Sequence, residues 1–224
     1  MSVQNQIKTG QIDVIEWTED SSGIMVWRFP AGRKDILYGA RLHVHEFQSA
    51  LFRFNHKTAD IFKPGIYTLT WENIPKLKIL QHIAPDSKEN FSADVFFLKT
   101  KYFFDEPWVF EKPVTLRDVT YGVVRLNAFG TFDIRVINGE KLIARMANAQ
   151  DSFTTAEAGH LVGKMVQNLL PDGLSQSNIS VLDEGNDYRD LILFIQESIN
   201  TELYSSGLMI ENLTCRTNVL KPEN

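Results

Sequence analysis

The segment Gly122–Ile137, GVVRLNAFGTFDIRVI, constrains the fold of this chain more than any other part of the sequence. Its apolar side chains recur at alternate positions and share one face: Val124, Leu126, Ala128, Phe132, Ile134 and Val136. Mainly polar side chains share the other face: Arg125, Asn127, Thr131, Asp133 and Arg135. Because side chains alternate across a strand, this pattern predicts one long strand with a buried face and a solvent-exposed face. Gly130 inside it predicts a bulge or a close approach of another backbone.

The order of the other apolar segments predicts the fold class. Strands are expected at Ile12–Trp17, Ile24–Phe29, Arg41–Asn55, Ala59–Phe62, Ile66–Trp71, Ser92–Thr100, Val114–Leu116 and Leu208–Cys215. Helical spacing is found at Glu140–Asn148, Thr154–Leu170 and Asp187–Tyr204. Thr154 and Glu157 fit a capping box, and Pro171 with Gly173 is expected to end the second helix. The order predicts an α+β fold, with a mainly antiparallel sheet and about three helices in the C-terminal half.

Composition narrows the class of protein. The net charge of −5 argues against a general nucleic-acid-binding protein, which would present a basic face. Cys215 is the only cysteine, so an intrachain disulfide is excluded and a reducing, cytoplasmic location is expected. The polar first residues do not resemble a secretion signal, and no apolar run is long enough to predict a membrane-spanning helix.

Several segments together match a family pattern. They are Ile12–Pro30 (IDVIEWTEDSSGIMVWRFP), Ile61–Leu69 (IFKPGIYTL), Glu72–Pro75, Leu116–Asp118, Gly122–Val136 and Gly207–Leu213. The combination resembles the SPFH or band 7 family, which includes stomatin, prohibitin, flotillin and HflK/C. The nearest likeness is to a bacterial branch often labelled "virion core protein-like". The resemblance predicts an SPFH-like domain over residues 12–215, with a flexible tail at residues 1–11 and a polar tail at residues 216–224.

The resemblance also implies a function. It points to a non-catalytic bacterial scaffold that self-associates and organises partner proteins at or near the cytoplasmic membrane, as in a stress response. The implied partners are the chain itself, phage-shock-type proteins and small membrane proteins, with peripheral contact at the inner face of the membrane. The family supplies no catalytic residues to carry over, so we predict no enzyme, no cofactor and no metal. Its members usually continue into a coiled coil, and this branch often ends in a zinc ribbon, whereas this chain ends at Asn224.

Two alternatives to a scaffold remain open at this stage. The label of the branch suggests a structural protein of a virus or phage particle. The second alternative is a metal-dependent enzyme, because His43 and His45 share one strand face at a spacing that suits a metal ion. A third ligand would come from His56, His82 or a carboxylate. The simpler interpretation makes both imidazoles polar residues of an exposed face, opposite an inward-facing Leu42 and Val44.

Two groups of residues are candidates for partner or membrane contact. The first group is the aromatic segment around Pro107, with Phe103, Phe104, Trp108 and Phe110. The second is the polar face of the long strand, with Arg125 and Arg135. We expect Trp108 to stay accessible, whereas the alternative is that these rings cover the apolar face of the sheet. The alternative interpretation of the two arginines is that they are solvated charges or form cross-strand pairs instead of contacting a partner. Phe194 lies off the main stripe of its helix, which fits either a wide buried face or a contact with a second subunit.

Overall fold

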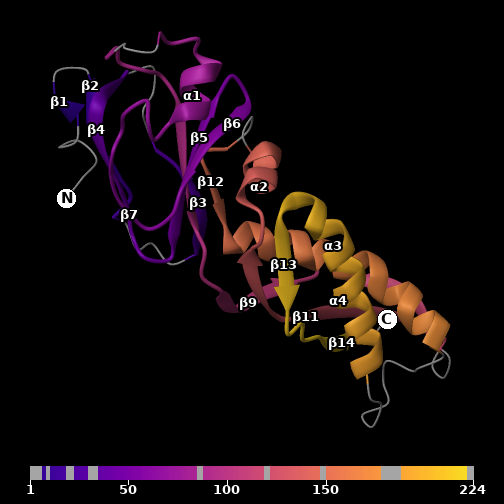
Figure 1. Ribbon diagram of the computed structural model, residues 1–224. Helices are drawn as coiled ribbons and strands as arrows, with labels where there is room; N and C mark the ends of the chain where they lie inside the picture. The colour runs from indigo at the N-terminus through magenta and orange to yellow at the C-terminus, as the bar shows by residue number, and fades with distance from the viewer. Residues whose placement is uncertain are drawn as a thin grey trace. The chain divides into compact units, whose positions relative to one another are not determined.

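The computed structural model describes residues 7–8, 11–18, 23–29, 35–84, 88–118, 122–146, 150–177 and 188–220. The chain is α+β with mainly antiparallel sheets, as predicted, and three of its α-helices lie in the C-terminal half (Figure 1). It divides into two compact units. The first comprises Met1–Lys101 with Asn138–Phe153, and the second comprises Tyr102–Ile137 with Thr154–Asn224. The bounds 12–215 for one SPFH-like domain stay a prediction.

The first unit contains two sheets. One has the order β1-β2-β4-β7, with strands β1 Ile7–Lys8, β2 Gln11–Glu16, β4 Ile36–Val44 and β7 Gly65–Thr68. The other has the order β12-β3-β8-β5-β6, with strands β12 Ser152–Thr154, β3 Ile24–Arg28, β8 Asp94–Lys99, β5 Gln48–Phe54 and β6 Lys57–Phe62. In the first sheet β2 and β4 are parallel, whereas β4 and β7 are antiparallel. Alternate side chains of β4 are buried in the core of this unit.

The core of the first unit draws side chains from both sheets. Ile15 and Leu42 from one sheet and Phe52 and Phe97 from the other are fully buried in a single hydrophobic cluster. Strand β8 is buried on both faces, as its continuous apolar run predicts. Helices α1 (Pro75–Leu80) and α2 (Gly139–Met146) complete this unit.

Strand β11, Gly122–Val136, organises the second unit and confirms the predicted long strand. It pairs antiparallel with four strands: β9 Phe103–Val109, β10 Val114–Asp118, β13 Leu208–Glu211 and β14 Arg216–Leu220. Leu126 pairs with both Val114 and Val219, so β10 and β14 lie on opposite edges of β11. Ile134 likewise pairs with both β9 and β13. Strand β14 falls within residues 216–224, which the sequence suggested to be a polar tail.

Helices cover one face of this second sheet. They are α3 (Thr155–Ser177) and α4 (Arg189–Leu203), the latter followed by a 3-10 turn at Tyr204–Ser206. Helix α3 contacts β9, β10 and β11, and α4 contacts β13 (Figure 1). The predicted buried face of β11 is confirmed at five positions: Val124, Leu126, Ala128, Phe132 and Ile134. The sixth predicted member, Val136, is only partly buried.

Helix α3 begins as predicted but ends later. The Glu157 backbone N–H donates to the Thr154 hydroxyl at 3.2 Å, and the Glu157 carboxylate accepts from the Thr154 backbone N–H at 2.8 Å. The predicted end at Pro171 is wrong, since the helix continues to Ser177. An interior proline costs about 3 kcal/mol. Leu170 and Leu174 are buried on either side of it, and each contributes about 1.5–3 kcal/mol, which offsets that cost.

Three glycines of the second unit each lie in close contact with the backbone of another segment. A Cβ at Gly130 would overlap the Thr214 carbonyl oxygen, so the predicted close approach within β11 is confirmed. In α3, a Cβ at Gly159 would overlap the Pro107 carbonyl oxygen. A Cβ at Gly163 would lie 2.5 Å from the Val109 carbonyl oxygen. One side of α3 therefore packs directly against the backbone of β9.

Replacing Gly163 by alanine should destabilise the chain although alanine is the better helix former. The propensity gain is about 1 kcal/mol, whereas a clash with a backbone atom of a paired strand costs more. Overpacking costs roughly 1–3 kcal/mol, so we expect a net loss of up to about 2 kcal/mol in the free energy of unfolding, measured by chemical denaturation.

Gly173→Ala in the same helix is the matched control. Its Cβ would meet only the end of the Leu191 side chain, which can rotate. Its stability should therefore stay within about 1 kcal/mol of the unsubstituted chain or rise. Equal losses for the two variants would contradict the backbone contact.

Candidate functional site

The aromatic segment forms strand β9 rather than an exposed loop. Phe103, Trp108 and Phe110 are buried, whereas Phe104 is 66% exposed. Asp105, with φ at +53°, interrupts the alternation between these residues. Of the four aromatic contact candidates, the structure therefore leaves only Phe104 on the surface of the chain.

The expectation that Trp108 stays accessible is wrong for the chain by itself. Its side chain is 2% exposed, and its Nε1–H donates to the Thr214 carbonyl oxygen at 3.0 Å. Its ring packs against that of Phe110 at 5.9 Å between centroids. Pairing of β9 with β11 turns Trp108 toward the covered side of the sheet, so the core alternative holds for this ring.

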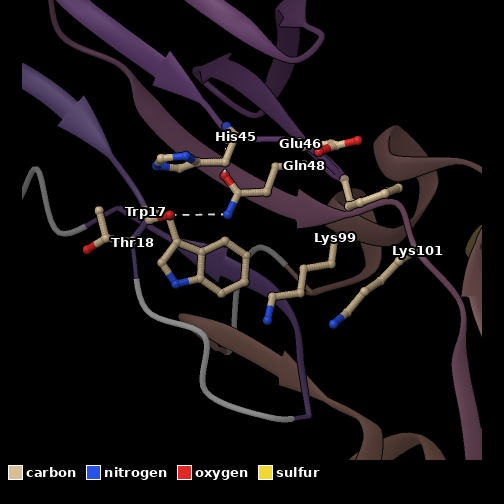
Figure 2. Close-up of a pocket in the computed structure, with 8 residues that line it drawn as sticks. Trp17, Thr18, His45, Glu46, Gln48, Lys99 and Lys101 are labelled. Atoms are coloured by element: carbon tan, nitrogen blue, oxygen red, sulfur yellow. Dashed lines mark hydrogen bonds between the residues drawn. The ribbon is translucent and has the colours of Figure 1, made fainter.

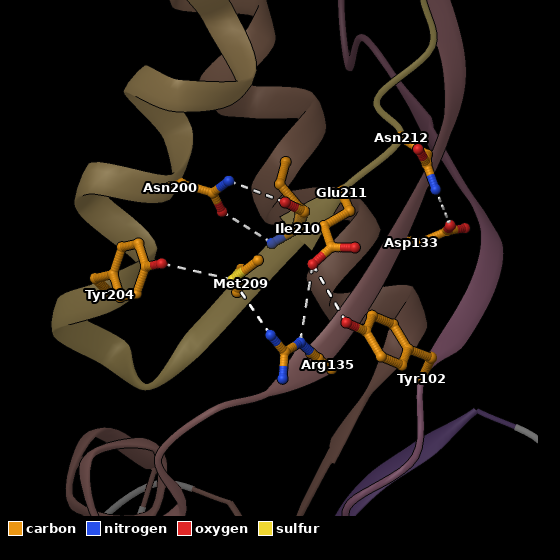
Figure 3. Close-up of polar contacts among 9 residues, drawn as sticks. All are labelled: Tyr102, Asp133, Arg135, Asn200, Tyr204, Met209, Ile210, Glu211 and Asn212. Atoms are coloured by element: carbon orange, nitrogen blue, oxygen red, sulfur yellow. Dashed lines mark hydrogen bonds and ion pairs between the residues drawn. The ribbon is translucent and has the colours of Figure 1, made fainter. Parts of the chain in front are cut away.

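Arg135 is part of a polar network inside the second unit (Figure 3). Its guanidinium lies 5.1 Å from the centre of the Tyr102 ring, a cation–π distance. Its Nε is 3.9 Å from Glu211 Oε1, which also accepts from the Tyr102 hydroxyl at 3.3 Å. Its Nη2 donates to Met209 Sδ at 3.8 Å. The network ties β11 to β13, so the cross-strand interpretation of Arg135 describes it best.

Asp133 does not lie on an exposed face as predicted, because the neighbouring segments cover it. Its carboxylate accepts from the Asp105 backbone N–H at 2.9 Å. It also accepts from Asn212 Nδ2 at 2.7 Å (Figure 3). The pairing of β9 with β11 shifts register between Phe132 and Ile134, beside this carboxylate. Sequence periodicity carries no signal for such a shift, which is why the prediction failed here.

The rest of the polar side of β11 forms an open face with a distinctive composition. We define the open face as the exposed or half-buried positions in register with Val123–Thr131: Pro107, Val109, Thr115, Arg117, Val123, Arg125, Asn127, Phe129, Thr131, Arg216, Asn218 and Leu220. Directly paired residues of antiparallel strands share a face, so these side chains are neighbours. Three are arginines, three are exposed large apolar residues and none is acidic. Arg125, a predicted contact residue, lies at its centre.

A second apolar surface lies on α4. Leu191 and Ile195 face the core, while Leu193 and Phe194 are each 55% exposed. A groove of about 370 Å³ adjoins Leu193, and its lining consists of Tyr188, Arg189, Ile192, Leu193, Leu213, Thr214 and Cys215. The helix thus presents both a projecting aromatic ring and a depression beside it.

In the first unit, His43 and His45 gather around a carboxylate. Strand pairing sets Glu16 of β2 opposite His43 of β4, and these three side chains are only partly exposed. Leu42 and Val44 point into the core, as the simpler interpretation expects. His56 instead lies 2.6 Å from Arg53. Among the described residues, Glu16, His43 and His45 are the group whose ligand atoms converge, so the third member is a carboxylate.

A pocket of about 340 Å³ adjoins His45 on its other side (Figure 2). Trp17, Lys99 and Lys101 contribute to its lining. The Lys99 ammonium lies 5.1 Å from the centre of the Trp17 ring. The pocket therefore combines an aromatic wall with two lysines and the carboxylate of Glu46, and the Lys99–Trp17 distance is a cation–π distance.

The comparison with known families agrees with the fold. A sequence profile of the SPFH domain-Band 7 family matches residues 26–224, which is most of the chain. The chain therefore belongs to the SPFH domain-Band 7 family. Members are in general membrane-associated scaffold proteins without catalysis. No curated protein matches the chain. Across the described residues, each helix is too short or too polar to cross a bilayer.

Cys215 is predicted to react slowly with thiol reagents. Burial raises the pKa of its thiol from 9.0 to about 12. The thiolate fraction at pH 8 is then roughly 1000-fold lower than in the unfolded chain, and greater intrinsic nucleophilicity recovers only about 30-fold of this. We therefore expect reaction with an aromatic disulfide reagent to be at least ~30-fold slower than in denaturant and to accelerate as pH rises toward 12. Equal rates in the two states would show that the thiol is not desolvated.

Proposed function

We propose that this chain is a non-catalytic bacterial scaffold domain that self-associates and organises partner proteins at the cytoplasmic face of the membrane, as in a stress response. The family supplies the general class of membrane-associated scaffold. Attachment to the membrane is peripheral and uses the open face of the second unit. Self-association uses the exposed apolar residues of α4. Its partners are phage-shock-type proteins or small membrane proteins.

The composition of the open face is the observation that carries this proposal. The chain as a whole has a net charge of −5, yet this face holds Arg117, Arg125 and Arg216 with no carboxylate among its positions. Exposed Val109 and Phe129 pair directly across β9 and β11, and each is close to half exposed or more. Cationic side chains around apolar ones match the headgroup region of an anionic bilayer, where guanidinium groups meet phosphates and apolar side chains enter the interface.

The magnitude of this attraction favours reversible binding. Each arginine near an anionic membrane surface contributes about 1 kcal/mol, so three give about 3 kcal/mol. The apolar side chains add to this only as far as they leave water. A scaffold that must assemble and disassemble at a membrane needs an attachment of this moderate strength rather than a permanent anchor.

Replacing Arg117, Arg125 and Arg216 together by glutamine should abolish most binding to anionic vesicles. A loss of about 3 kcal/mol corresponds to roughly 100-fold in the partition constant. The measurement is flotation with phosphatidylglycerol vesicles and with phosphatidylcholine vesicles of the same size. Binding of the unsubstituted chain should be confined to the anionic vesicles and should weaken as salt screens the charges.

A matched control removes the same charge elsewhere. Lys57, Lys63 and Lys76 are exposed residues of the first unit, and their replacement by glutamine should leave vesicle binding within a few-fold of the unsubstituted chain. The proposal fails if the unsubstituted chain does not float with anionic vesicles at low salt. It also fails if the two triple variants lose binding equally, because net charge rather than the open face would then control attachment.

Self-association is proposed to join α4 of one copy to α4 of another. Phe194 is exposed on the helix whose Ile192 and Leu193 line the groove, so a two-fold contact would place the ring of each copy in the groove of the other. Such a contact is self-complementary, as a two-fold interface requires. It would also bury apolar side chains that a single copy leaves in water.

Replacing Leu193 and Phe194 together by serine should shift the chain toward monomer. Both side chains are outside the buried stripe, so the fold should persist while the apolar contact is lost. Sedimentation velocity over a range of concentrations measures the shift. Ile79→Ser, at a residue of α1 that is 73% exposed, is the control and should not change the association. A monomeric unsubstituted chain at high concentration would contradict this interface.

The partners can be sought with the same variants. Cross-linking in native membranes followed by purification should recover small membrane proteins or phage-shock-type proteins with the unsubstituted chain. Recovery should fall for the variant lacking the three open-face arginines, because that variant leaves the membrane. Recovery of capsid or tail proteins instead would overturn the scaffold assignment in favour of a particle protein.

A further inference from the structure

We propose that Glu16, His43 and His45 of the first unit bind a divalent transition-metal ion, with Zn²⁺ as the ion that suits their ligand atoms best. Nothing in the scaffold function requires such a site. The proposal rests on the convergence of two imidazole nitrogens and one carboxylate oxygen from two neighbouring strands. Their donor atoms all lie within 4.8 Å of one another.

The distances match those of ligands that share an ion. Glu16 Oε1 lies 2.7 Å from His43 Nδ1 and 2.9 Å from His45 Nε2. The two imidazole rings are 4.0 Å apart between centroids. Donor atoms bonded tetrahedrally to one zinc ion at about 2.1 Å lie roughly 3.4 Å apart, so the carboxylate oxygen must move away from the two nitrogens by only about half an ångström to admit an ion. The same carboxylate oxygen is the common neighbour of both nitrogens, which orients both rings toward one point.

Backbone pairing places these donors before any ion binds. Parallel pairing of β2 with β4 sets Glu16 opposite His43, and alternation returns His45 to the same face two residues later. Leu42 and Val44, on either side of His43, point the other way and are buried in the core of the first unit. Any slip of one residue between β2 and β4 would expose this core, so packing holds the ligands in register.

Gln48 fixes the backbone beside two of the three ligands. Its side-chain Nε2 donates to the Trp17 carbonyl oxygen at 3.1 Å, next to Glu16 in the chain (Figure 2). Its Oε1 accepts from the His45 backbone N–H at 3.3 Å, and its own backbone N–H donates to the His45 carbonyl oxygen at 3.1 Å. Gln48 is buried, so these contacts are shielded from water. The amide therefore links the end of β2 to the turn that carries His45.

The ligand set and its exposure indicate the type of site. Two imidazoles and one carboxylate suit zinc and related transition ions better than calcium or magnesium, which prefer oxygen donors. The side chains are 36% exposed for each histidine and 21% for Glu16, so an ion is reachable from solvent. Three protein ligands leave at least one position for water or another small ligand. An ion here would link β2 to β4, and binding to the folded state alone would stabilise it.

Another histidine–carboxylate pair in the chain provides a contrast. His160 of α3 lies 2.8 Å from Glu111, and this pair is part of the second unit. Among the described residues it does not gather a third ligand atom, so it cannot chelate an ion in the same way. If histidine and carboxylate proximity alone bound zinc, both places would bind it. If three convergent donors are required, only the cluster of the first unit should do so.

The test is calorimetric titration of the full chain with Zn²⁺ after treatment with a chelator. We expect one ion per chain with a micromolar or tighter dissociation constant. Glu16→Gln, His43→Asn and His45→Asn should each weaken binding by more than about 100-fold, since even changes around the ligands cost about 10–100-fold. His160→Asn should leave the affinity unchanged. Zinc should raise the thermal unfolding midpoint of the unsubstituted chain and fail to do so in the three ligand variants.

A second measurement makes the test independent of how the variants fold. Co²⁺ added to the unsubstituted chain should give visible d–d absorption of a nitrogen–oxygen site, and Zn²⁺ should abolish it. Circular dichroism in chelator establishes whether each variant is folded. The proposal is overturned if the unsubstituted chain does not bind zinc at micromolar concentration. It is equally overturned if folded variants bind as the unsubstituted chain does, or if His160→Asn removes the binding.

Discussion

The pairing of β11 along both of its edges is the constraint on which the second unit depends. At Leu126 and again at Ile134, a strand lies on each side, so the central backbone finds partners in both directions. One face then receives the helices and becomes core. On the other face, the positions of the open face stay exposed or half-buried. This asymmetry leaves the open face, with Arg125 at its centre, as the surface for which we propose a membrane contact.

The long strand, the start of α3 and the apolar stripe of α4 depend on residues close together in the chain, and these features could be predicted from the sequence. The alternation in Gly122–Ile137 identified the longest strand and its buried face, and Thr154 with Glu157 identified the start of α3. Helix α4 follows its apolar stripe, and Gly207 ends the 3-10 turn that follows it, at a positive φ of 74°. Each signal depends on residues a few positions apart. Such patterns are legible because the period of a strand or helix is set by its own backbone geometry.

Features set by distant contacts could not be predicted in this way. The helix passes Pro171 because Leu170 and Leu174 are buried on either side of it, and Trp108 is buried because β9 pairs with β11. Asp133 is covered where the register of that pairing shifts. The histidine pair was recognised from its spacing, but Glu16 as the third donor followed only from the parallel pairing of β2 with β4. Glu16 is too far from His43 along the chain for the periodicity of one strand to relate the two residues.

Strand alternation also explains why both candidate surfaces coexist with a stable core. The metal-ligand cluster and the open face occupy the solvent side of strands whose other side chains fill the interior, so each set can change without repacking the other. Arg135 shows the opposite case. It belongs to the same polar side of β11 as Arg125, yet its contacts with Tyr102, Met209 and Glu211 tie it to the internal structure. Substituting Arg135 would thus disturb the sheet as well as its surface. Arg125, by contrast, has an exposed side chain on the open face.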